Sequence, residues 1–108
     1  MELKQAADSF AALSQPSRLA VLQLLREAGP AGARPSQMAI TLQLPANTLS
    51  FHLRQLRQAG LISEQRSGRD RVYRANHDAL EQLLRYLGET AGSQNLLAPD
   101  PVSLAGER

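Results

Sequence analysis

The apolar residues of this chain recur every three or four positions in five separate segments, which is the spacing of amphipathic helices. Residues 3–13 and 16–28 are the first two of these segments. Leucine and valine fall nearly all round the second, so we expect it to be the central and most buried helix. Residues 30–35 read as a loop, after which Ser36 can cap a third helix.

The stretch from residue 37 to residue 59 predicts two short helices around a tight turn at residues 44–46. In the second of these helices Leu49, Leu53 and Leu56 recur at i, i+4 and i+7, so they form one buried stripe. The opposite face and its flanks consist of Asn47, Ser50, Phe51, Arg54, Gln55 and Gln58. This face has hydrogen-bonding groups, one cation and one aromatic ring, but no carboxylate. A helix that approaches phosphates needs such a face, because carboxylates would be repelled there.

A β-hairpin is predicted directly after Gly60, where the helix stops. Residues 61–66 and 71–75 read as two short strands on either side of Ser67-Gly68-Arg69-Asp70. A glycine among polar neighbours between two such runs is typical of a hairpin turn.

A last helix follows the hairpin, with Asn76 or Asp78 as its cap. Its apolar residues form one narrow stripe of Leu80, Leu83, Leu84 and Leu87. From Gly92 onward the periodicity ends and glycine and proline are frequent, which is typical of a flexible tail. We therefore predict one mainly α-helical domain with a small β-hairpin over residues 1–91, and a flexible C-terminal tail over residues 92–108.

The first and last helices each carry an apolar stripe that the small core of the middle helices does not need. Two spare stripes on so short a chain predict a homodimer. The alternative is that both stripes pack on their own protomer. The residues expected in the dimer interface are Leu3, Phe10, Leu80, Leu83, Leu84 and Leu87.

Composition narrows the classes of protein. The chain has 108 residues, of which 43% are hydrophobic, as expected for one globular domain. It has no cysteine, which excludes disulfides and thiolate metal sites. No apolar run approaches the roughly 18 residues that span a bilayer and no signal peptide is visible, so we expect a cytoplasmic protein without a membrane partner. No nucleophile–base pair, glycine-rich phosphate loop or carboxylate cluster appears, so we do not expect an enzyme.

The charges are unevenly distributed along the chain. Residues 45–75 contain six arginines against Glu64 and Asp70, whereas the remaining residues have six Lys or Arg against eight Asp or Glu. A segregated basic segment points to a polyanionic partner. A solvated charged face is the simpler alternative.

Three blocks of sequence, LSQPSRLAVLQLL, PANTLSFHLRQLRQAGLI and RSGRDRVY, occur in the order and spacing of one known family. They resemble the ArsR/SmtB family of bacterial transcriptional repressors, and the resemblance covers about residues 3–90. It implies a winged helix-turn-helix homodimer of four helices, a β-hairpin wing and a fifth helix. Proteins of this family bind pseudo-palindromic double-stranded DNA operators, and an effector, often a metal or metalloid, lowers their affinity for DNA.

The resemblance places Thr48 and Ser50 at polar positions of the recognition helix. Together with the exposed face above, the expected DNA-binding residues are Asn47, Thr48, Ser50, Phe51, Arg54, Gln55, Arg66, Arg69 and Arg71. The three wing arginines are expected on phosphates, or with one of them in the minor groove. His52 matches the family's His-Leu pair, and we interpret it as a hydrogen-bonded structural histidine, with base reading as the alternative. Gln43 stands where the family usually has glycine, and a positive φ there would cost about 1 kcal/mol.

The family's best-known metal sites are missing their ligands in this chain, so we expect no metal and no cofactor. Arg34 and Ser36 stand at the positions of the thiol site, and neither supplies a soft thiolate. The positions of the His/Asp site on the last helix hold His77, Ala79, Thr90 and Ser93, which leaves one good ligand per subunit where zinc needs four in all. Ala91 and Gly92 replace the paired cysteines of an arsenic-responsive branch.

Two questions stay open from the sequence. An unidentified small-molecule effector would make the protein a ligand-responsive repressor, and without one it would be a regulator with no direct ligand. The second question is whether the protein binds DNA at all, because a winged-helix module could instead contact proteins without binding DNA directly.

Overall fold

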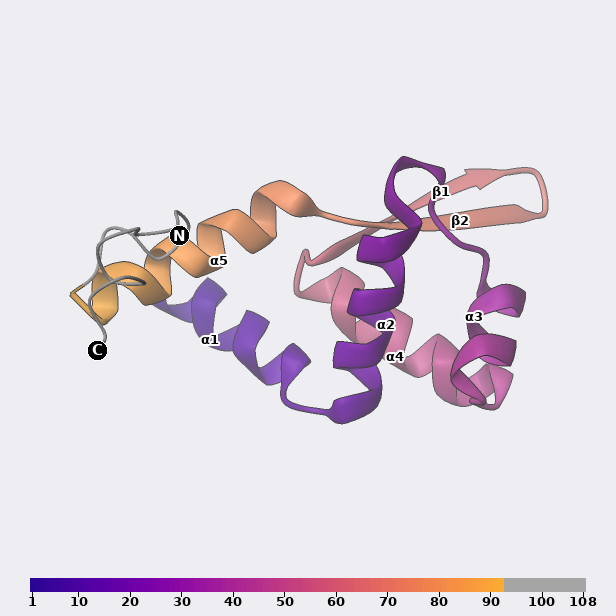
Figure 1. Cartoon of the computed structure of the whole chain (residues 1–108), viewed down its shortest axis with the longest axis horizontal. Coiled ribbons are helices and arrows are strands. Elements are labelled where there is room, and N and C mark those ends of the chain that lie inside the picture. Colours follow the sequence, from indigo (N-terminus) through magenta and orange to yellow (C-terminus); the bar gives the residue numbers. More distant parts are fainter. Residues whose placement is uncertain (93–108) are drawn as a thin grey trace, which may run out of the picture.

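The computed structural model of the protein describes residues 1–92, and these residues form five α-helices, one short 3₁₀ helix and one two-stranded sheet (Figure 1). In chain order the elements are α1 (Leu3–Leu13), α2 (Pro16–Ala28), η1 (Gly29–Ala31), α3 (Pro35–Leu42), α4 (Ala46–Gln58), β1 (Ile62–Ser67), β2 (Asp70–Ala75) and α5 (His77–Thr90). The predicted fold class, mainly α with a small hairpin, is confirmed. The tail predicted from residue 92 lies, apart from Gly92, outside the described residues. None of the described helices combines the length and apolar content that crossing a bilayer requires.

Local chemistry explains where the helices begin. The side chain of Gln15 accepts a hydrogen bond from the Arg18 backbone N–H at 3.0 Å and caps α2, while Asn76 does the same for α5. The expected cap of α3 at Ser36 is wrong, because this helix already begins at Pro35. Proline is suited to the first helical position, where its fixed φ is helical and its missing N–H costs nothing.

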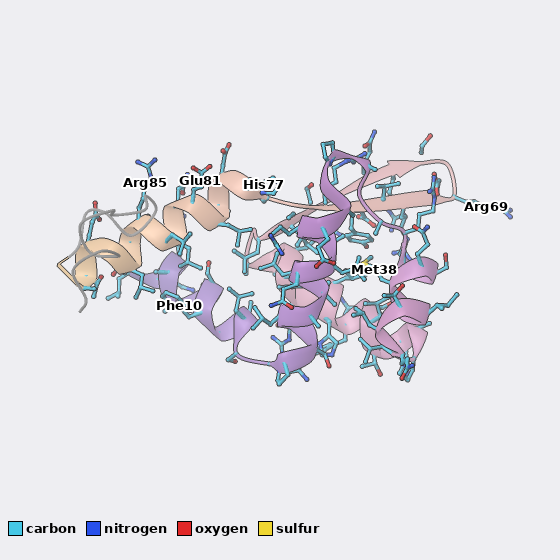
Figure 2. All side chains as sticks on the ribbon, in the orientation of Figure 1. Phe10, Met38, Arg69, His77, Glu81 and Arg85 are labelled. Atoms are coloured by element: carbon cyan, nitrogen blue, oxygen red, sulfur yellow. The ribbon has the colours of Figure 1, made fainter. Side chains whose placement is uncertain are left out.

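The core is built around α2 and the inner face of α4. Leu49, Leu53 and Leu56 are 2% exposed or less, as their spacing predicted. The expected burial of α2 on all sides is only partly seen. Val21, Leu22 and Leu25 are buried, but Leu19 is 41% exposed. Neighbouring elements therefore cover this helix on one side, and one of its leucines faces outward. Met38 of α3 is fully buried in the same core (Figure 2).

The segment between α2 and α3 is more ordered than the predicted loop. It contains η1, and Ala33 then exchanges two backbone hydrogen bonds with Tyr73 of β2, at 3.0 and 2.9 Å. A single bridged residue has no alternating pattern, which is why periodicity did not indicate it. Gly32 allows this close approach, since a Cβ there would lie 2.6 Å from the Tyr73 carbonyl oxygen.

The turn between α3 and α4 places Gln43 in a conformation that favours glycine. Gln43 has φ 55° and ψ 46°, in the left-handed region. The chain thus accepts about 1 kcal/mol of backbone strain at this position. Pro45 follows and directly precedes the first residue of α4.

The hairpin has the predicted turn and a regular register. Antiparallel pairs run from Ile62 with Ala75 to Ser67 with Asp70, which leaves a two-residue turn. Gly68 takes a φ of 63° at its first position. In the view of Figure 1 this hairpin projects from one end of the molecule, while α1 and α5 lie side by side at the other end.

Candidate nucleic-acid interface

The outer face of α4 is open to solvent. Asn47, Ser50, Phe51 and Arg54 are exposed, whereas Thr48 and Gln55 are half-buried at its edges. Phe51 is 47% exposed, which is unusual for a large aromatic side chain and agrees with its predicted orientation away from the leucine stripe.

Two neighbours flank the exposed ring of Phe51. The Arg18 guanidinium of α2 lies 6.0 Å from its centroid, within the range of a cation–π contact. The ring of His52 meets it edge-on, also with 6.0 Å between the centroids. These contacts restrict the ring on the surface of the helix without covering it.

His52 itself is a buried residue of α4, only 6% exposed. The burial agrees with a structural role, but the predicted hydrogen bonding is wrong for its Nδ1, which has no partner among the described residues. Burial lowers the pKa of His52 below its ordinary value of 6.5, and the nearby positive charge of Arg18 lowers it further. The folded protein therefore favours the neutral imidazole.

Acid should destabilise the fold through His52. Between pH 7.5 and 5.5 the unfolded chain takes up a proton that the folded chain resists, so the free energy of unfolding should fall as the pH drops below about 6.5. We expect His52→Leu to flatten this slope in denaturant titrations at fixed protein concentration, and the exposed His77→Gln to retain it. An equally steep slope in His52→Leu would exclude His52 as its source. Glu64 and Asp70 titrate lower, because both have pKa values below their ordinary ones.

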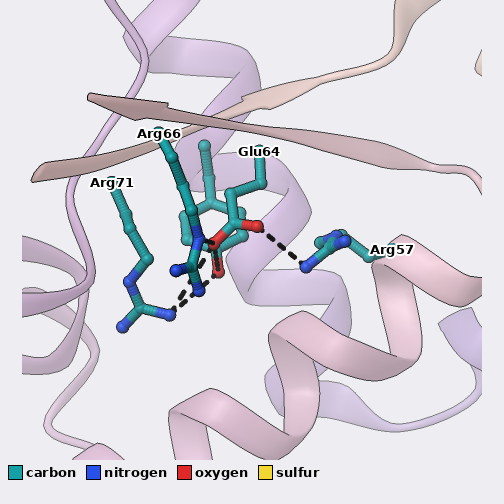
Figure 3. A network of polar contacts seen from close by, with 5 residues as sticks. Arg57, Glu64, Arg66 and Arg71 are labelled. Atoms are coloured by element: carbon teal, nitrogen blue, oxygen red, sulfur yellow. Dashed lines mark hydrogen bonds and ion pairs between the residues drawn. The ribbon is translucent and has the colours of Figure 1, made fainter. Parts of the chain in front are cut away.

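The base of the wing is an ion-pair cluster centred on Glu64 of β1 (Figure 3). Its carboxylate accepts hydrogen bonds from Arg57 at 2.9 Å, from the Tyr73 hydroxyl at 2.9 Å and from Arg66 at 3.3 Å. A third guanidinium, that of Arg71, lies 3.7 Å away. The Glu64 side chain is 8% exposed, so this cluster joins the end of α4 to both wing strands through one buried carboxylate.

Glu64 stays ionised in this setting. Burial by itself would raise the pKa of Glu64, but the hydrogen bond from Tyr73 and the charges of Arg66 and Arg57 outweigh it. The pKa of Glu64 is consequently held below its ordinary value.

Among the described residues, four of the six arginines of the basic segment are engaged by other groups of the protein, and two are not. Arg57, Arg66 and Arg71 are held by Glu64, while Arg74 donates to the Pro30 carbonyl and to Gln65. Within residues 1–92, Arg54 and Arg69 form no side-chain hydrogen bond or ion pair. Arg69 projects from the tip of the wing (Figure 2).

The wing is also tied to the start of α3. Arg34 donates to both carboxylate oxygens of Asp70, at 2.7 and 2.9 Å, and this hydrogen bonding lowers the pKa of Asp70. Both acidic residues of the basic segment, Glu64 and Asp70, therefore form ion pairs with arginines.

Sequence reasoning treated Glu64 only as a negative charge and did not place Arg57 in the site. One signal was available: by the alternation of a strand, Glu64 lies on the same face as the buried Ile62. A carboxylate on the inward face of a half-buried strand needs cationic partners. Which arginines supply them depends on tertiary contacts that spacing does not give.

All the residues expected in a dimer interface except Leu3 border a groove of about 760 Å³ between α1 and α5. Leu84 and Leu87 of α5 and Phe10 of α1 remain 40–43% exposed, and Leu3 is 73% exposed. Leu80 is half-buried against the core. Leu83 also lines the groove but is only 5% exposed in one protomer, and its place in the interface stays a prediction.

No group of three or more His, Cys, Asp or Glu side chains within residues 1–92 is arranged to hold a metal ion. Arg34, at the position of the family's thiol site, is instead engaged with Asp70 of the wing.

Comparisons with known proteins agree with this geometry. A family model described as a helix-turn-helix domain matches residues 13–65. The HTH-type transcriptional regulator YgaV of Escherichia coli is 31% identical over 84 residues, which cover 78% of this chain and 83% of that protein. An ArsR-like transcriptional regulator from Rhodococcus sp. RHA1 has 30% identity and a TM-score of 0.72 over 82% of this chain and 81% of its own.

A third relative is described as homodimeric. It is the winged helix-turn-helix DNA-binding domain of a possible ArsR-family transcriptional regulator from Mycobacterium bovis, with 25% identity and a TM-score of 0.66 over 83% of this chain and 80% of its own. The first two relatives are named as transcriptional regulators, and the third as a possible one. With the exposed helix, the wing and these likenesses together, the chain belongs to the ArsR family of DNA-binding helix-turn-helix transcriptional regulators.

Proposed function

We propose that this protein is a repressor that binds a pseudo-palindromic operator as a homodimer, with α4 of each subunit in a major groove and the wings on the flanking backbone. The observation that carries the proposal is the exposed, carboxylate-free face of α4 beside a wing rich in arginine. On this reading Phe51 and Arg54 contact bases, with Phe51 suited to a thymine methyl group. Asn47, Thr48, Ser50 and Gln55 supply further hydrogen bonds to bases or phosphates.

Dimerisation through α1 and α5 is supported by two separate observations. Phe10, Leu84 and Leu87 leave apolar surface around a groove of about 760 Å³. Exposed apolar patches of this kind mark interfaces. The relative from Mycobacterium bovis is homodimeric. A two-fold dimer would present two recognition helices to successive major grooves, about one turn of DNA apart.

The direct test is footprinting of the protein on the DNA upstream of its own gene, followed by titration of the protected fragment at several salt concentrations. We expect two protected half-sites and a steep fall of affinity with salt, because phosphate contacts release counterions. A module that contacts only proteins would give no protection. An affinity for the best site that does not change with salt would also contradict the electrostatic part of the proposal.

Zinc and arsenite should not release the protein from this DNA. No cysteine is present in the sequence, and His77 is the one good donor among the described positions that match the family's site on the last helix. Titration of either metal to micromolar concentration into the protein–DNA complex should leave the affinity unchanged. Release that disappears in His77→Ala would overturn this expectation. An unchanged affinity would direct the search for an effector to small organic molecules.

A further inference from the structure

A polar cleft of about 280 Å³ lies between α4 and the base of the wing. Its lining consists of Ser50, Arg54, Arg57, Glu64, Arg66, Arg71 and Tyr73. Four guanidiniums and one carboxylate give this small space a net charge of +3. We propose that the cleft is a preorganised site for one backbone phosphate of the bound DNA, and that Glu64 is the positioning residue that aims its arginines. This inference rests on the proposed function and adds to it a specific phosphate site.

The arginines of the cleft retain donors for an anion. A guanidinium has five N–H groups, and Glu64 engages few of those on Arg57, Arg66 and Arg71. Their side chains remain 51%, 66% and 38% exposed, whereas the Glu64 side chain is 8% exposed. The carboxylate therefore sits beneath the guanidiniums, and the outer N–H groups and the Ser50 hydroxyl are available to a ligand.

Glu64 gives these long side chains a fixed geometry. Three arginines drawn together without a counter-charge would repel one another and spread into solvent. The buried carboxylate contacts Arg57 of α4, Arg66 of β1 and Arg71 of β2 at the same time (Figure 3). An incoming phosphate then meets donors that are already ordered, and less side-chain entropy is lost on binding.

A phosphodiester is the ligand that fits these features. The cleft is cationic and adjoins the exposed face of α4 through Ser50 and Arg54, so a strand of DNA that contacts this face would run past the cleft. Arginine forks match the oxygen geometry of phosphate. The unexpected consequence is that an acidic residue at a DNA-facing surface supports the binding of DNA.

The first test replaces Glu64 in the otherwise intact protein. Glu64→Gln removes a negative charge, so simple electrostatics predicts tighter binding. We expect the opposite: affinity for the footprinted fragment should fall about tenfold. The control is Glu27→Gln, an exposed acid of α2, which should change little. Affinity in Glu64→Gln equal to or above that of the wild type would overturn the positioning role. Affinity for a random duplex should fall by a similar factor, because a phosphate contact carries no sequence information.

The second test does not depend on the stability of Glu64→Gln. Each phosphate of the fragment is replaced in turn by an uncharged methylphosphonate, and binding is measured with the wild type, Arg57→Ala and Arg85→Ala, an exposed arginine of α5. At one phosphate per half-site the replacement should weaken the wild type and Arg85→Ala about tenfold, but Arg57→Ala much less, because its partner is already missing.

The outcomes separate the two proposals. If the effects of Arg57→Ala and methylphosphonate add at every phosphate, no phosphate occupies the cleft and this inference is wrong, while the proposed function stands. If inorganic phosphate binds the free protein through Arg57 and no such coupling appears, the cleft is a site for free phosphate and the assignment to DNA is also wrong. If the wild type does not bind duplex DNA at all, both proposals fail.

Discussion

Leu84→Glu and Leu87→Glu should each convert the dimer into monomers. Both leucines lie on α5 at the groove, 42% and 43% exposed in one protomer. In a two-fold interface each substitution enters twice, and burying the remaining 42–43% of each leucine is worth about 0.6–1.3 kcal/mol per copy. Each glutamate would also be placed in a low-dielectric contact without a partner. The combined loss of about 4 kcal/mol or more corresponds to a roughly thousandfold weaker dimer.

Sedimentation velocity at micromolar concentration measures this directly. Leu19→Glu is a matched control, because Leu19 has the same side chain and a similar exposure of 41%, but it lies on α2 and does not line the groove. The control should remain dimeric. Both α5 variants should also lose most of their affinity for a two-half-site operator, since a monomer engages one half-site only. Unchanged dimers in both would remove α5 from the interface.

The sequence predicted well those features that follow from one element at a time. The spacing of Leu49, Leu53 and Leu56 fixes the inner face of α4, and the same helical periodicity turns Phe51 outward. The hairpin turn at Gly68 likewise follows from local chemistry. In each case the signal lies within a few neighbouring residues, so no contact with a distant part of the chain is needed to predict the feature.

The features that the sequence did not predict join distant parts of the chain. Ala33 and Tyr73 pair across 40 positions, and Arg34 and Asp70 across 36. Leu83 looks like its neighbours in the leucine stripe, yet it is 5% exposed in one protomer while Leu84 and Leu87 are 42% and 43% exposed. Spacing gives the face of a helix, but not which neighbour covers each part of that face.

The charge count shows the same limit in the candidate site. An excess of arginine in residues 45–75 indicated a basic segment, but a count of charges does not say which arginines are held by other side chains. In the structure Glu64 holds three of them at the base of the wing, and Arg69 extends from the tip. These two groups should contribute differently to DNA binding, which variants can resolve.

Substitutions in α4 should change which DNA sequence is bound, and a substitution at the wing tip should not. Phe51→Ala removes an exposed apolar contact without changing the charge, so binding to random DNA and the salt dependence should persist. Arg54→Ala removes a cation that has no internal partner within residues 1–92 and can form two hydrogen bonds to a base. We expect each to reduce discrimination between the operator and random DNA by about 10–100-fold per half-site, as for the loss of a base contact worth about 1–3 kcal/mol.

Arg69→Ala should instead weaken binding to every sequence by a similar factor. Loss of one phosphate contact per subunit should flatten the slope of log affinity against log salt by about 0.9 per subunit, or about 1.8 for the dimer. Arg85→Ala, in α5 away from the wing, serves as the control for a simple change of net charge (Figure 2). Anisotropy titrations of the operator and a random duplex at four salt concentrations give both quantities at once. If Phe51→Ala kept full discrimination while Arg69→Ala lost it, the wing would be the element that reads sequence, and the roles assigned to α4 and the wing would have to be exchanged.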